Sequence, residues 1–342
     1  QRQVSLSEVG EAGQEKLRQS KVLVIGAGGL GCPTLEYLTA AGVGEILICD
    51  YDTVDLSNLH RQVLFSPDDI GKPKAEVACK KLQKQNPFIK INYSLEKFNL
   101  DFDIEPFDLV IDCCDNFKTK FSAHDLCFKL KKNLVQASIH KFEGQVQVFN
   151  YSSYTESTPC LRCLWPQIPK KDCVQTCSEA GVLGVVPGVL GTVQATEAIK
   201  IILHLPTLNT GETLFVNLFQ FSSYKVKWSK HVQCPLCKNS KDKDIDLTSL
   251  DYGISHQEII FNKVHLKQDY IINIGDPHQT KVKADLTIDL DSLLNKVEQL
   301  PISEKYIIIC NRGINSLTAT KKIAELGHKN FYSVIDGLEG II

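Results

Sequence analysis

The chain has 342 residues, with 38 basic and 40 acidic side chains, 43% apolar residues and 13 cysteines. This length supports one large or two ordinary domains, and the formal charge of −2 gives no reason to expect a nucleic acid or an anionic membrane as a partner. No apolar stretch approaches the roughly 20 residues of a membrane-spanning helix, and the first residues do not resemble a signal peptide. We therefore expect a cytoplasmic protein whose cysteines are free thiols, metal ligands or nucleophiles rather than a disulfide framework.

Residues 1–238 alternate short apolar runs with helical patterns. This alternation predicts an α/β domain with a doubly wound, Rossmann-like, mostly parallel sheet. The expected elements are a strand over Lys21–Ile25, a helix over Leu30–Ala41, strands over Glu45–Asp50 and Asp108–Asp112, and a helix over Val189–Leu203.

The composition becomes polar and charged after Lys238, and residues 239–246 are typical of a solvated linker. Beyond the linker, residues 247–342 are expected to form a second, smaller α/β domain. Its expected elements are Asp269–Ile274 and Tyr306–Ile309 as strands and Leu317–Leu326 as a helix.

The segment over residues 26–31 (GAGGLG) has the G-x-G-x-x-G spacing and lies between an expected strand and an expected helix. Its glycines permit a tight turn and let a phosphate approach the backbone amides at the helix N-terminus. Asp50 ends the second expected strand about 20 residues further on, where a carboxylate can hold a ribose hydroxyl. These residues predict a nucleotide site. The pattern alone also fits an NAD enzyme, and the alternative is a glycine turn used only for close packing.

Basic residues follow Asp50 in the sequence, and they favour a chemistry other than hydride transfer. Arg61 lies in residues 57–62 (SNLHRQ), and Lys74 lies in residues 71–74 (GKPK). An enzyme that splits a triphosphate needs such cations because negative charge grows on the leaving pyrophosphate. Residues 112–116 (DCCDN) end a strand at the carboxyl edge of the sheet, where a carboxylate could carry Mg²⁺. The chain has no G-x-x-x-x-G-K-[ST] sequence, so it is not a P-loop ATPase.

Nearly all of residues 1–238 resembles the ThiF/MoeB group of ubiquitin-activating-type adenylyltransferases. The resemblance rests on RQV near the start, GAGGLG, DYDTVDLSNLHRQ, GKPKAE, CCDN, FEGQV, CSEAGVLG, GTVQATEAIK and CPLC, in this order. It implies that the chain uses ATP to adenylate the C-terminal glycine carboxylate of a ubiquitin-like sulfur-carrier protein ending in Gly-Gly, with release of pyrophosphate.

The resemblance also implies roles for individual residues. The expected nucleotide-binding residues are Gly26, Gly28, Gly29, Gly31, Asp50, Ser57, Asn58, Leu59, His60, Arg61, Gln62, Lys74, Asp115 and Asn116. Among them, Arg61 and Lys74 would act on the triphosphate, and Asp115 would hold Mg²⁺. Arg2 matches an arginine that in the family reaches into the neighbouring subunit's site, which implies a homodimer. Taken singly, each cation would be read as a solvated surface charge, and Asp115 as a helix cap.

Two Cys-x-x-Cys pairs, Cys160 with Cys163 and Cys234 with Cys237, lie far apart in the chain. Four thiolates suit a closed tetrahedral zinc site with no open position for catalysis. One pair would also fit a redox site, but two separated pairs without a histidine favour structural zinc. The family has a structural zinc at these positions.

Cys177 lies in residues 176–181 (TCSEAG), after a polar stretch that reads as a loop. In relatives that handle sulfur, the matching cysteine can bond covalently to the carrier, whereas in relatives that only adenylate it can be dispensable. Cys173, four residues earlier, is a second thiol in the same stretch. The remaining cysteines of the first domain are expected to be core residues: Cys32, Cys49, Cys79, Cys113, Cys114 and Cys127.

Cys310 follows the expected buried strand Tyr306–Ile309 and precedes a helical run. Loop amides, the helix N-terminus and Arg312 would stabilise a thiolate there, which suits a persulfide carrier, while the alternative is a buried strand-end cysteine. The region after the linker resembles the rhodanese fold, and the whole chain is similar to MoeB–rhodanese fusions. Ser316 takes the place of the arginine of a Cys-x₅-Arg phosphatase loop, and residues 273–276 (NIGD) stand where rhodaneses usually show Asp-Val-Arg.

The leading interpretation is an enzyme that adenylates a sulfur carrier and then delivers sulfur from a Cys310 persulfide, leaving a thiocarboxylate. The sulfur would come from a donor such as a cysteine desulfurase, and the carrier would serve molybdopterin, thiamin or tRNA-thiolation pathways. A second interpretation keeps the adenylation and makes the second domain a docking module without catalysis. A third is an NAD-dependent oxidoreductase with a zinc-stabilised lobe, which leaves Arg61, Lys74 and Asp115 unexplained together.

Overall fold

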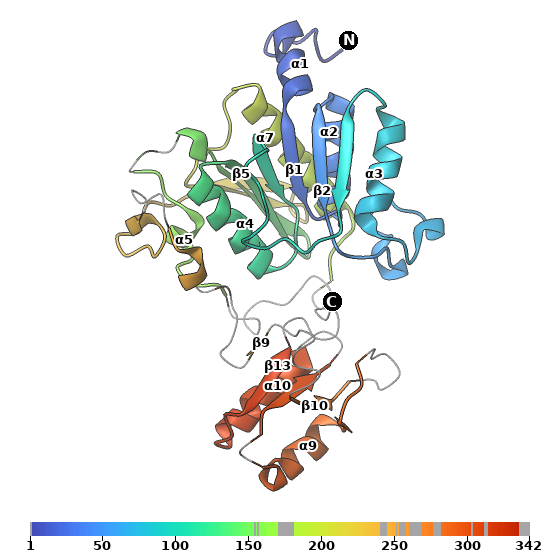
Figure 1. Cartoon of the computed structure of the whole chain (residues 1–342). Helices are drawn as coiled ribbons and strands as arrows, with labels where there is room; N and C mark the ends of the chain where they lie inside the picture. The colour runs from blue at the N-terminus through green and yellow to red at the C-terminus, as the bar shows by residue number, and fades with distance from the viewer. Residues whose placement is uncertain are drawn as a thin grey trace. The chain divides into compact units, whose positions relative to one another are not determined.

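The computed structural model divides the chain into two compact units, Gln1–Gly253 and Ile254–Ile342, both drawn in Figure 1. The residues it describes are 2–153, 155, 157–169, 181–239, 245–250, 252, 258–259, 269–275, 282–301, 304–310 and 314–334.

The first unit is built around one mixed sheet, whose strand order in the described residues is β3-β2-β1-β4-β5-β6-β7-β8. Strands β3 to β5 of this order are parallel, and β6, β7 and β8 extend the sheet in antiparallel fashion. The strands are β1 (Lys21–Ile25), β2 (Glu45–Cys49), β3 (Lys90–Ser94), β4 (Leu109–Asp112), β5 (Asn133–His140), β6 (Glu143–Phe149), β7 (Glu212–Asn217) and β8 (Ser222–Lys227). The prediction of a doubly wound, mostly parallel sheet is confirmed.

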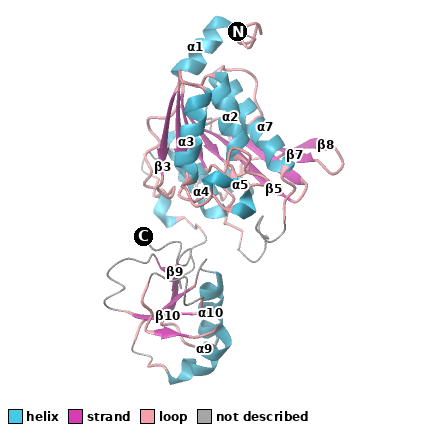
Figure 2. Ribbon diagram, turned by 90° about the vertical axis from the view of Figure 1, so that its right-hand side faces the viewer, coloured by secondary structure: helices cyan, strands magenta, loops and turns pink. Residues whose placement is uncertain are grey.

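Helices cover both faces of this sheet (Figure 2). One face packs against α1, α2, α3 and α7, and the opposite face packs against α4 and α5. Their bounds are α1 (Gly10–Gln19), α2 (Gly31–Ala41), α3 (Lys74–Gln85), α4 (Phe117–Leu130), α5 (Leu161–Leu164) and α7 (Val185–Ile202). Because both faces are covered, residues 22–25 of β1 and 109–111 of β4 are unbroken apolar runs, and this is why the positions of these strands were predictable.

Helix α7 is the one helix in the described residues that is long and apolar enough to cross a membrane, with a mean hydropathy of 1.3 over 18 residues. This differs from the expectation that no stretch approaches that length. Half of the stretch is buried, and the helix packs against α2, β5 and β6, as a core helix does. Gly191 permits the close packing, since a Cβ there would lie 2.4 Å from the carbonyl oxygen of Leu30.

The strand order reverses between β1 and β4, because β2 and β3 lie on one side of β1 and β4 and β5 on the other. In sheets of this kind, ligands bind in the crevice outside the carboxyl ends of the two strands at the reversal. The segments that follow β1 and β4 touch there: the Cys113 amide donates to the Ile25 carbonyl at 2.8 Å. The topology therefore places the candidate site at this edge.

The first unit extends beyond the linker that the sequence placed at 239–246. Leu247 and Tyr252 are buried in the same core as α4, and the Tyr252 hydroxyl donates to the Asp125 carboxylate at 2.9 Å. The division between the units consequently falls after Gly253. The polar composition before residue 245 marked a change in the chain, but the packing partners of Leu247 were not visible in the sequence.

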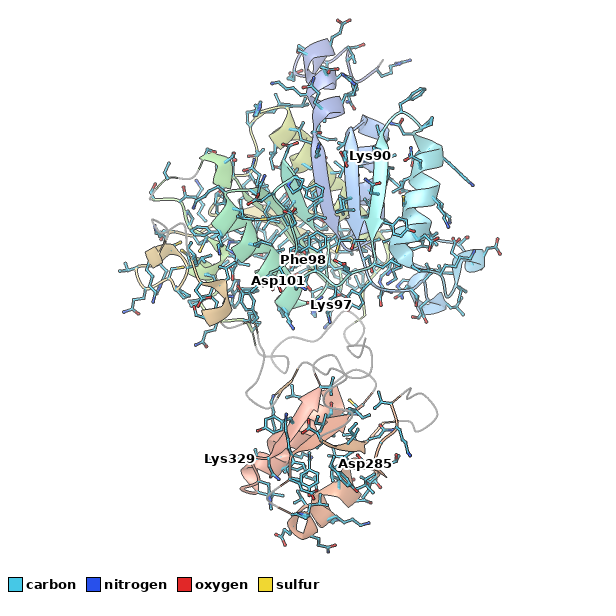
Figure 3. The ribbon with its side chains drawn as sticks, in the orientation of Figure 1. Lys90, Lys97, Phe98, Asp101, Asp285 and Lys329 are labelled. Atoms are coloured by element: carbon cyan, nitrogen blue, oxygen red, sulfur yellow. The ribbon has the colours of Figure 1, made fainter. Side chains whose placement is uncertain are left out.

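The second unit contains a parallel sheet with the order β11-β10-β12-β13-β9 in its described part. Its elements are β9 (Glu258–Ile259), β10 (Tyr270–Asn273), β11 (Leu286–Thr287), α9 (Leu290–Lys296), β12 (Tyr306–Ile309), α10 (Ile314–Glu325) and β13 (Phe331–Val334). Ile308, Ile323 and Phe331 belong to a core that this sheet forms with α9 and α10. Asp285, labelled in Figure 3, accepts the Ile271 amide at 2.8 Å and ties the segment before β11 to β10. The predicted second, smaller α/β unit is present.

Candidate active site

The glycine turn over residues 26–31 joins β1 to α2 at the strand reversal. Gly26 has a φ of +93°, and a Cβ there would lie 3.0 Å from the Cys113 carbonyl oxygen. At Gly31 a Cβ would lie only 2.1 Å from the Gly26 carbonyl oxygen. Both positions therefore require glycine, and the turn brings the N-terminus of α2 to the crevice, where backbone amides suit a phosphate.

Asp50 directly follows β2 and is fixed against the glycine turn. Its Oδ2 accepts the Ala27 amide at 2.7 Å, and its Oδ1 accepts the Asp52 amide at 2.8 Å. Burial raises the pKa of the Asp50 carboxyl, while the charge of Lys74 and the two amides oppose this shift. This geometry suits a carboxylate that accepts hydrogen bonds from a ribose.

Arg61 and Gln62 lie over the glycine turn. The Arg61 guanidinium donates to the Asn58 side-chain oxygen at 2.6 Å, and its Cγ would lie 3.5 Å from a Cβ on Gly29. The Gln62 Nε2 would lie 3.6 Å from a Cβ on Gly28. Gln62 is 4% exposed, and its Oε1 has no hydrogen-bond partner among the described residues. A buried amide oxygen without a partner beside this turn suits a donor group on a ligand.

Lys74 begins α3 and is 4% exposed, and its Nζ pairs with the Asp52 carboxylate at 2.7 Å. A bound triphosphate would therefore compete with Asp52 for this cation. Ser57 and His60 are exposed on the preceding segment, where the His60 Nδ1 lies 3.0 Å from the Ser57 carbonyl oxygen. Leu59 is half-buried and packs on the apolar core, so it supports this segment from below.

The loop over residues 112–116 joins β4 to α4. Asp115 is exposed, and a carboxylate oxygen is the kind of ligand that Mg²⁺ prefers, so this residue fits the predicted role. Asn116, not Asp115, caps α4, because its side chain accepts the Thr119 amide at 2.8 Å. Beneath the loop, the fully buried Asp112 pairs with Lys120 at 2.6 Å, a contact that the sequence analysis missed. The one signal was a lysine at a core-facing position of α4.

Arg2 does not reach the site of its own chain. Its neighbour Gln3 donates to the Ala41 carbonyl at 3.3 Å, at the C-terminal end of α2. The glycine turn lies at the opposite end of this helix, about 16 Å away at 1.5 Å per residue. Figure 1 shows the N-terminus near α1, which precedes the amino end of β1.

The two Cys-x-x-Cys pairs come together in the first unit. Their four sulfurs lie within 4.8 Å of one another, and all four residues are buried. The sulfur-to-sulfur contacts run from 3.3 Å for Cys160–Cys237 to 3.8 Å for Cys160–Cys163. Four ligands at about 2.3 Å around a tetrahedral zinc would be about 3.8 Å apart. The cluster could therefore hold a metal, and its four thiols fit zinc.

A bound metal ion would also balance the negative charge of the four thiolates. Burial raises the pKa of the Cys160 thiol, whereas hydrogen bonds from the neighbouring thiols lower the pKa of Cys163. The four groups therefore cannot all ionise in this space without a cation. Zinc would supply that charge and close the site.

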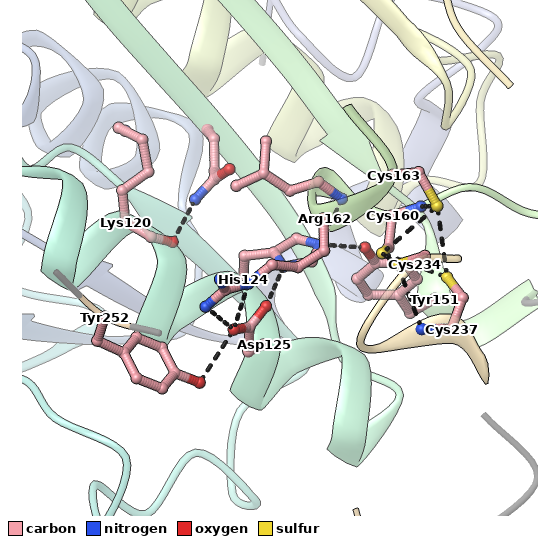
Figure 4. A network of polar contacts seen from close by, with 12 residues as sticks. Lys120, His124, Asp125, Tyr151, Cys160, Arg162, Cys163, Cys234, Cys237 and Tyr252 are labelled. Atoms are coloured by element: carbon pink, nitrogen blue, oxygen red, sulfur yellow. Dashed lines mark hydrogen bonds and ion pairs between the residues drawn. The ribbon is translucent and has the colours of Figure 1, made fainter. Parts of the chain in front are cut away.

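A buried polar network lies beside the cysteine cluster (Figure 4). Asp125 on α4 accepts hydrogen bonds from Arg162 at 2.8 Å and from Tyr252 at 2.9 Å. His124 lies 2.7 Å from the other Asp125 oxygen, and its Nε2 accepts the Leu161 amide at 2.9 Å. Since Leu161 and Arg162 are the residues between Cys160 and Cys163, the network fastens this pair to α4.

Cys310 lies at the end of β12 and is 4% exposed. Its sulfur accepts the Ser316 amide at 3.3 Å and lies 3.2 Å from the Ser316 hydroxyl oxygen. That hydroxyl is in turn 2.8 Å from the hydroxyl of Ser333 on β13. The structure thus provides donors to the sulfur from α10, as the sequence predicted for a strand end before a helix.

The other described cysteines of the first unit are unsuited to thiolate chemistry. Burial raises the pKa of Cys32 and of Cys49 to about 12, and it also raises the pKa of Cys79 and of Cys113. Cys114 and Cys127 shift in the same direction for the same reason. Cys173, Cys177 and Arg312 lie outside the described residues.

A glycine turn, a fixed carboxylate and cations at the strand reversal define a nucleotide-handling enzyme site of the Rossmann-like class. Residues 1–236 match the ThiF family. The chain therefore belongs to this family, which confirms the resemblance read from its segments.

Several curated proteins are similar to this chain. A sulfur carrier protein adenylyltransferase of Thermus thermophilus is 42% identical over 240 residues, covering 69% of this chain and 89% of that protein. The adenylyltransferase and sulfurtransferase MOCS3 of Culex quinquefasciatus is 34% identical, covering 95% of this chain and 81% of that protein. The adenylyltransferase and sulfurtransferase UBA4 of Meyerozyma guilliermondii is 36% identical, covering 98% of this chain and 86% of that protein.

Solved structures share the fold. Escherichia coli MccB with ATP has a TM-score of 0.57 and 23% identity, covering 66% of this chain and 68% of that chain. MccB with a MccA peptide derivative gives the same TM-score of 0.57 at 22% identity. At this level of identity the likeness shows the common architecture alone.

Proposed function

We propose that this protein uses ATP to adenylate the C-terminal glycine of a ubiquitin-like sulfur carrier and then transfers sulfur to the acyl adenylate. The convergence of the glycine turn, Asp50, Arg61 and Gln62 at the strand reversal carries the first half of the proposal. The relatives named adenylyltransferase and sulfurtransferase support the second half, because they match 95% and 98% of this chain and so include its second unit.

In the adenylation step, a carboxylate oxygen of the carrier attacks the α-phosphorus of ATP. The bond between the α-phosphorus and the bridging oxygen breaks, and pyrophosphate leaves with its electron pair. Arg61 and Lys74 stabilise the charge that grows on the leaving group, and Asp50 holds the ribose. Asp115 is the residue that would hold Mg²⁺, which lowers the charge of the triphosphate when bound.

In the sulfur step, the Cys310 thiolate attacks the outer sulfur of a persulfide donor and releases the donor thiolate. The resulting Cys310 persulfide then attacks the acyl carbon of the adenylate and displaces AMP. The product is an acyl disulfide, and a second thiol cleaves its S–S bond to release the carrier thiocarboxylate. Cys177 is a candidate for this second thiol, and zinc at the four-cysteine cluster has a structural role.

Mass spectrometry of a carrier ending in Gly-Gly, incubated with ATP, Mg²⁺ and a persulfide donor, tests both steps. We expect an acyl adenylate without the donor and a thiocarboxylate with it. The Cys310→Ala variant should form the adenylate at an unchanged rate and yield no thiocarboxylate. Thiocarboxylate formation by this variant would instead make the second unit a docking module, and the absence of pyrophosphate release would exclude adenylation.

We also propose that the protein works as a homodimer in which Arg2 completes the site of the partner subunit. Arg2 lies far from the glycine turn of its own chain, so it acts across an interface if it acts at all. Mixing Arg2→Ala subunits with Asp115→Ala subunits should restore part of the activity, because one site of the heterodimer keeps both groups. A lack of complementation after verified subunit exchange would rule out this arrangement.

A further inference from the structure

The loop over residues 112–116 carries Asp115 and Asn116 and rests directly on the glycine turn. A Cβ on Gly26 would meet the Cys113 carbonyl oxygen at 3.0 Å, and the Cys113 amide donates to the Ile25 carbonyl at 2.8 Å. A shift of this loop would therefore change the distance between Asp115 and any phosphate bound at the turn.

Asp112 holds the loop from inside the protein through four hydrogen bonds. Its Oδ2 accepts from the Lys120 ammonium at 2.6 Å and from the Gln136 amide at 3.0 Å. Its Oδ1 accepts the Cys114 backbone amide at 3.0 Å, and its carbonyl oxygen accepts from Gln194 at 2.8 Å. The carboxylate thus joins α4, β5 and the loop at one point.

Lys120 is the cation that makes this arrangement possible. Its Nζ donates to the Ala137 carbonyl at 2.8 Å in addition to Asp112, and its side chain is 10% exposed. Burial lowers the pKa of Lys120, but the charge and hydrogen bond of Asp112, together with the nearby thiols of Cys113 and Cys114, more than offset this, so its pKa lies above the ordinary value. A buried carboxylate that loses its cation is strongly destabilised, whereas a well-packed apolar pair in its place can be neutral. Stability alone therefore does not require charges here.

We propose that Lys120 is a positioning residue for adenylation, which fixes the loop through Asp112 so that Asp115 faces the cation of Mg–ATP. The proposal rests on the proposed function, in which Asp115 holds that cation. Lys120 itself lies beneath the loop and acts through Asp112.

Equilibrium binding of ATP to the full-length protein, measured by calorimetry with Mg²⁺ and with EDTA, tests this role. The Lys120→Met variant should bind Mg–ATP about tenfold more weakly, the usual scale for losing a group that orients a metal ligand. Its affinity for metal-free ATP should stay within about twofold, because Asp50 and the glycine turn are unchanged. The Lys120→Arg variant keeps the charge and should recover most of the Mg–ATP affinity.

Arg162→Met is the matched control, because it also removes the buried cationic partner of an α4 carboxylate, Asp125 (Figure 4). We expect both methionine variants to lower the melting temperature and only Lys120→Met to weaken Mg–ATP binding. If Lys120→Met is unfolded, the Asp112→Asn, Lys120→Met double variant removes both charges and should show the same selective loss.

Two results separate the ways in which the proposal can fail. Equal losses of thermal stability in the two methionine variants with unchanged Mg–ATP affinity would make Lys120 merely structural. An Asp115→Ala variant with normal Mg–ATP affinity would instead overturn the assignment of Asp115, on which the inference rests.

Discussion

The two candidate sites of this chain offer different groups to an anion. The nucleotide site gathers side chains from several elements of the first unit and surrounds the crevice with charges, those of Asp50, Arg61 and Lys74. In the part of the chain that the structure describes, Cys310 lies between one strand end and one helix, and its sulfur contacts the neutral amide and hydroxyl of Ser316. A triphosphate carries several charges that grow during reaction, whereas a persulfide carries one. Among the described residues, formal charge is thus concentrated at the site where the proposed transition state needs it.

Arg61→Ala should give the largest effect. It tests whether adenylation depends on the nucleotide site and not on the Cys310 site. We expect carrier-dependent ATP–pyrophosphate exchange to fall by about 10²-fold or more, the scale for losing one charge-stabilising group. Sulfur transfer from thiosulfate to cyanide should not change, because we assign that reaction to Cys310 in the second unit. The control Lys72→Ala removes a cation whose side chain is 58% exposed and should leave both reactions intact. A retained exchange rate in Arg61→Ala would reject this site.

The Cys160→Ser variant tests whether the four-cysteine cluster stabilises the first unit. The variant should lose its metal and a part of its folding free energy together, because structural zinc binding is coupled to folding. We expect the melting temperature to fall on the order of 10 °C, since a domain of this size loses about 2–4 °C per kcal/mol. Metal analysis and calorimetry check this, and a metal-free protein of unchanged stability would contradict it.

Ser316→Ala tests whether sulfur transfer at Cys310 depends on neutral hydrogen-bond donors. Hydrogen bonds to a charged group contribute about 1.5 kcal/mol or more, so sulfur transfer to cyanide should slow about tenfold. Thr320→Val removes another buried hydroxyl of α10, which donates to the Leu317 carbonyl at 2.9 Å, and should leave the rate unchanged. Equal rates in both variants would show that the Ser316 hydroxyl is dispensable.

The smallest effect concerns pH. Burial raises the pKa of Asp50, so its protonated form appears at a higher pH than for an ordinary aspartate. A protonated carboxyl is a poorer acceptor for ribose hydroxyls, and ATP affinity should therefore fall a few-fold as the pH drops toward this pKa. Asp50→Asn should lack this part of the pH dependence. Calorimetric titrations of both proteins under the same conditions cancel the protonation of ATP itself, and parallel curves would contradict the prediction.

Sequence reasoning located the elements whose signal is local. Tyr306–Ile309 was predicted with the bounds that the structure shows, because a buried parallel strand is an unbroken apolar run. Helix α7 begins at Val185, four residues before its predicted start, since Pro187 and Gly188 look like helix breakers although proline is tolerated in a first turn. The two-residue strand β11 offered no pattern at all.

The same limit holds for the nucleotide site, where only residues with a local sequence signal could be predicted. The glycine turn, Asp50 and Arg61 come from segments whose spacing is readable, and the structure brings them together. The Asp112–Lys120 pair and the Asp52–Lys74 pair were not foreseen, because each joins separate elements and neither residue signals its partner. The roles assigned to the site residues, Cys177 among them, and the assignments of Mg²⁺ and zinc stay predictions.

The burial of cysteines in the first unit affects which thiols can accept sulfur from a persulfide donor. A persulfide donor exchanges sulfur with any accessible thiolate, so each exposed low-pKa cysteine near the nucleotide would divert sulfur before it reached the acyl carbon. Burial keeps Cys32, Cys49 and Cys113 protonated near neutral pH. These three buried thiols are therefore poor acceptors of sulfane sulfur. Among the described cysteines of the first unit, the raised pKa values of these three direct sulfane sulfur toward thiols that ionise more readily.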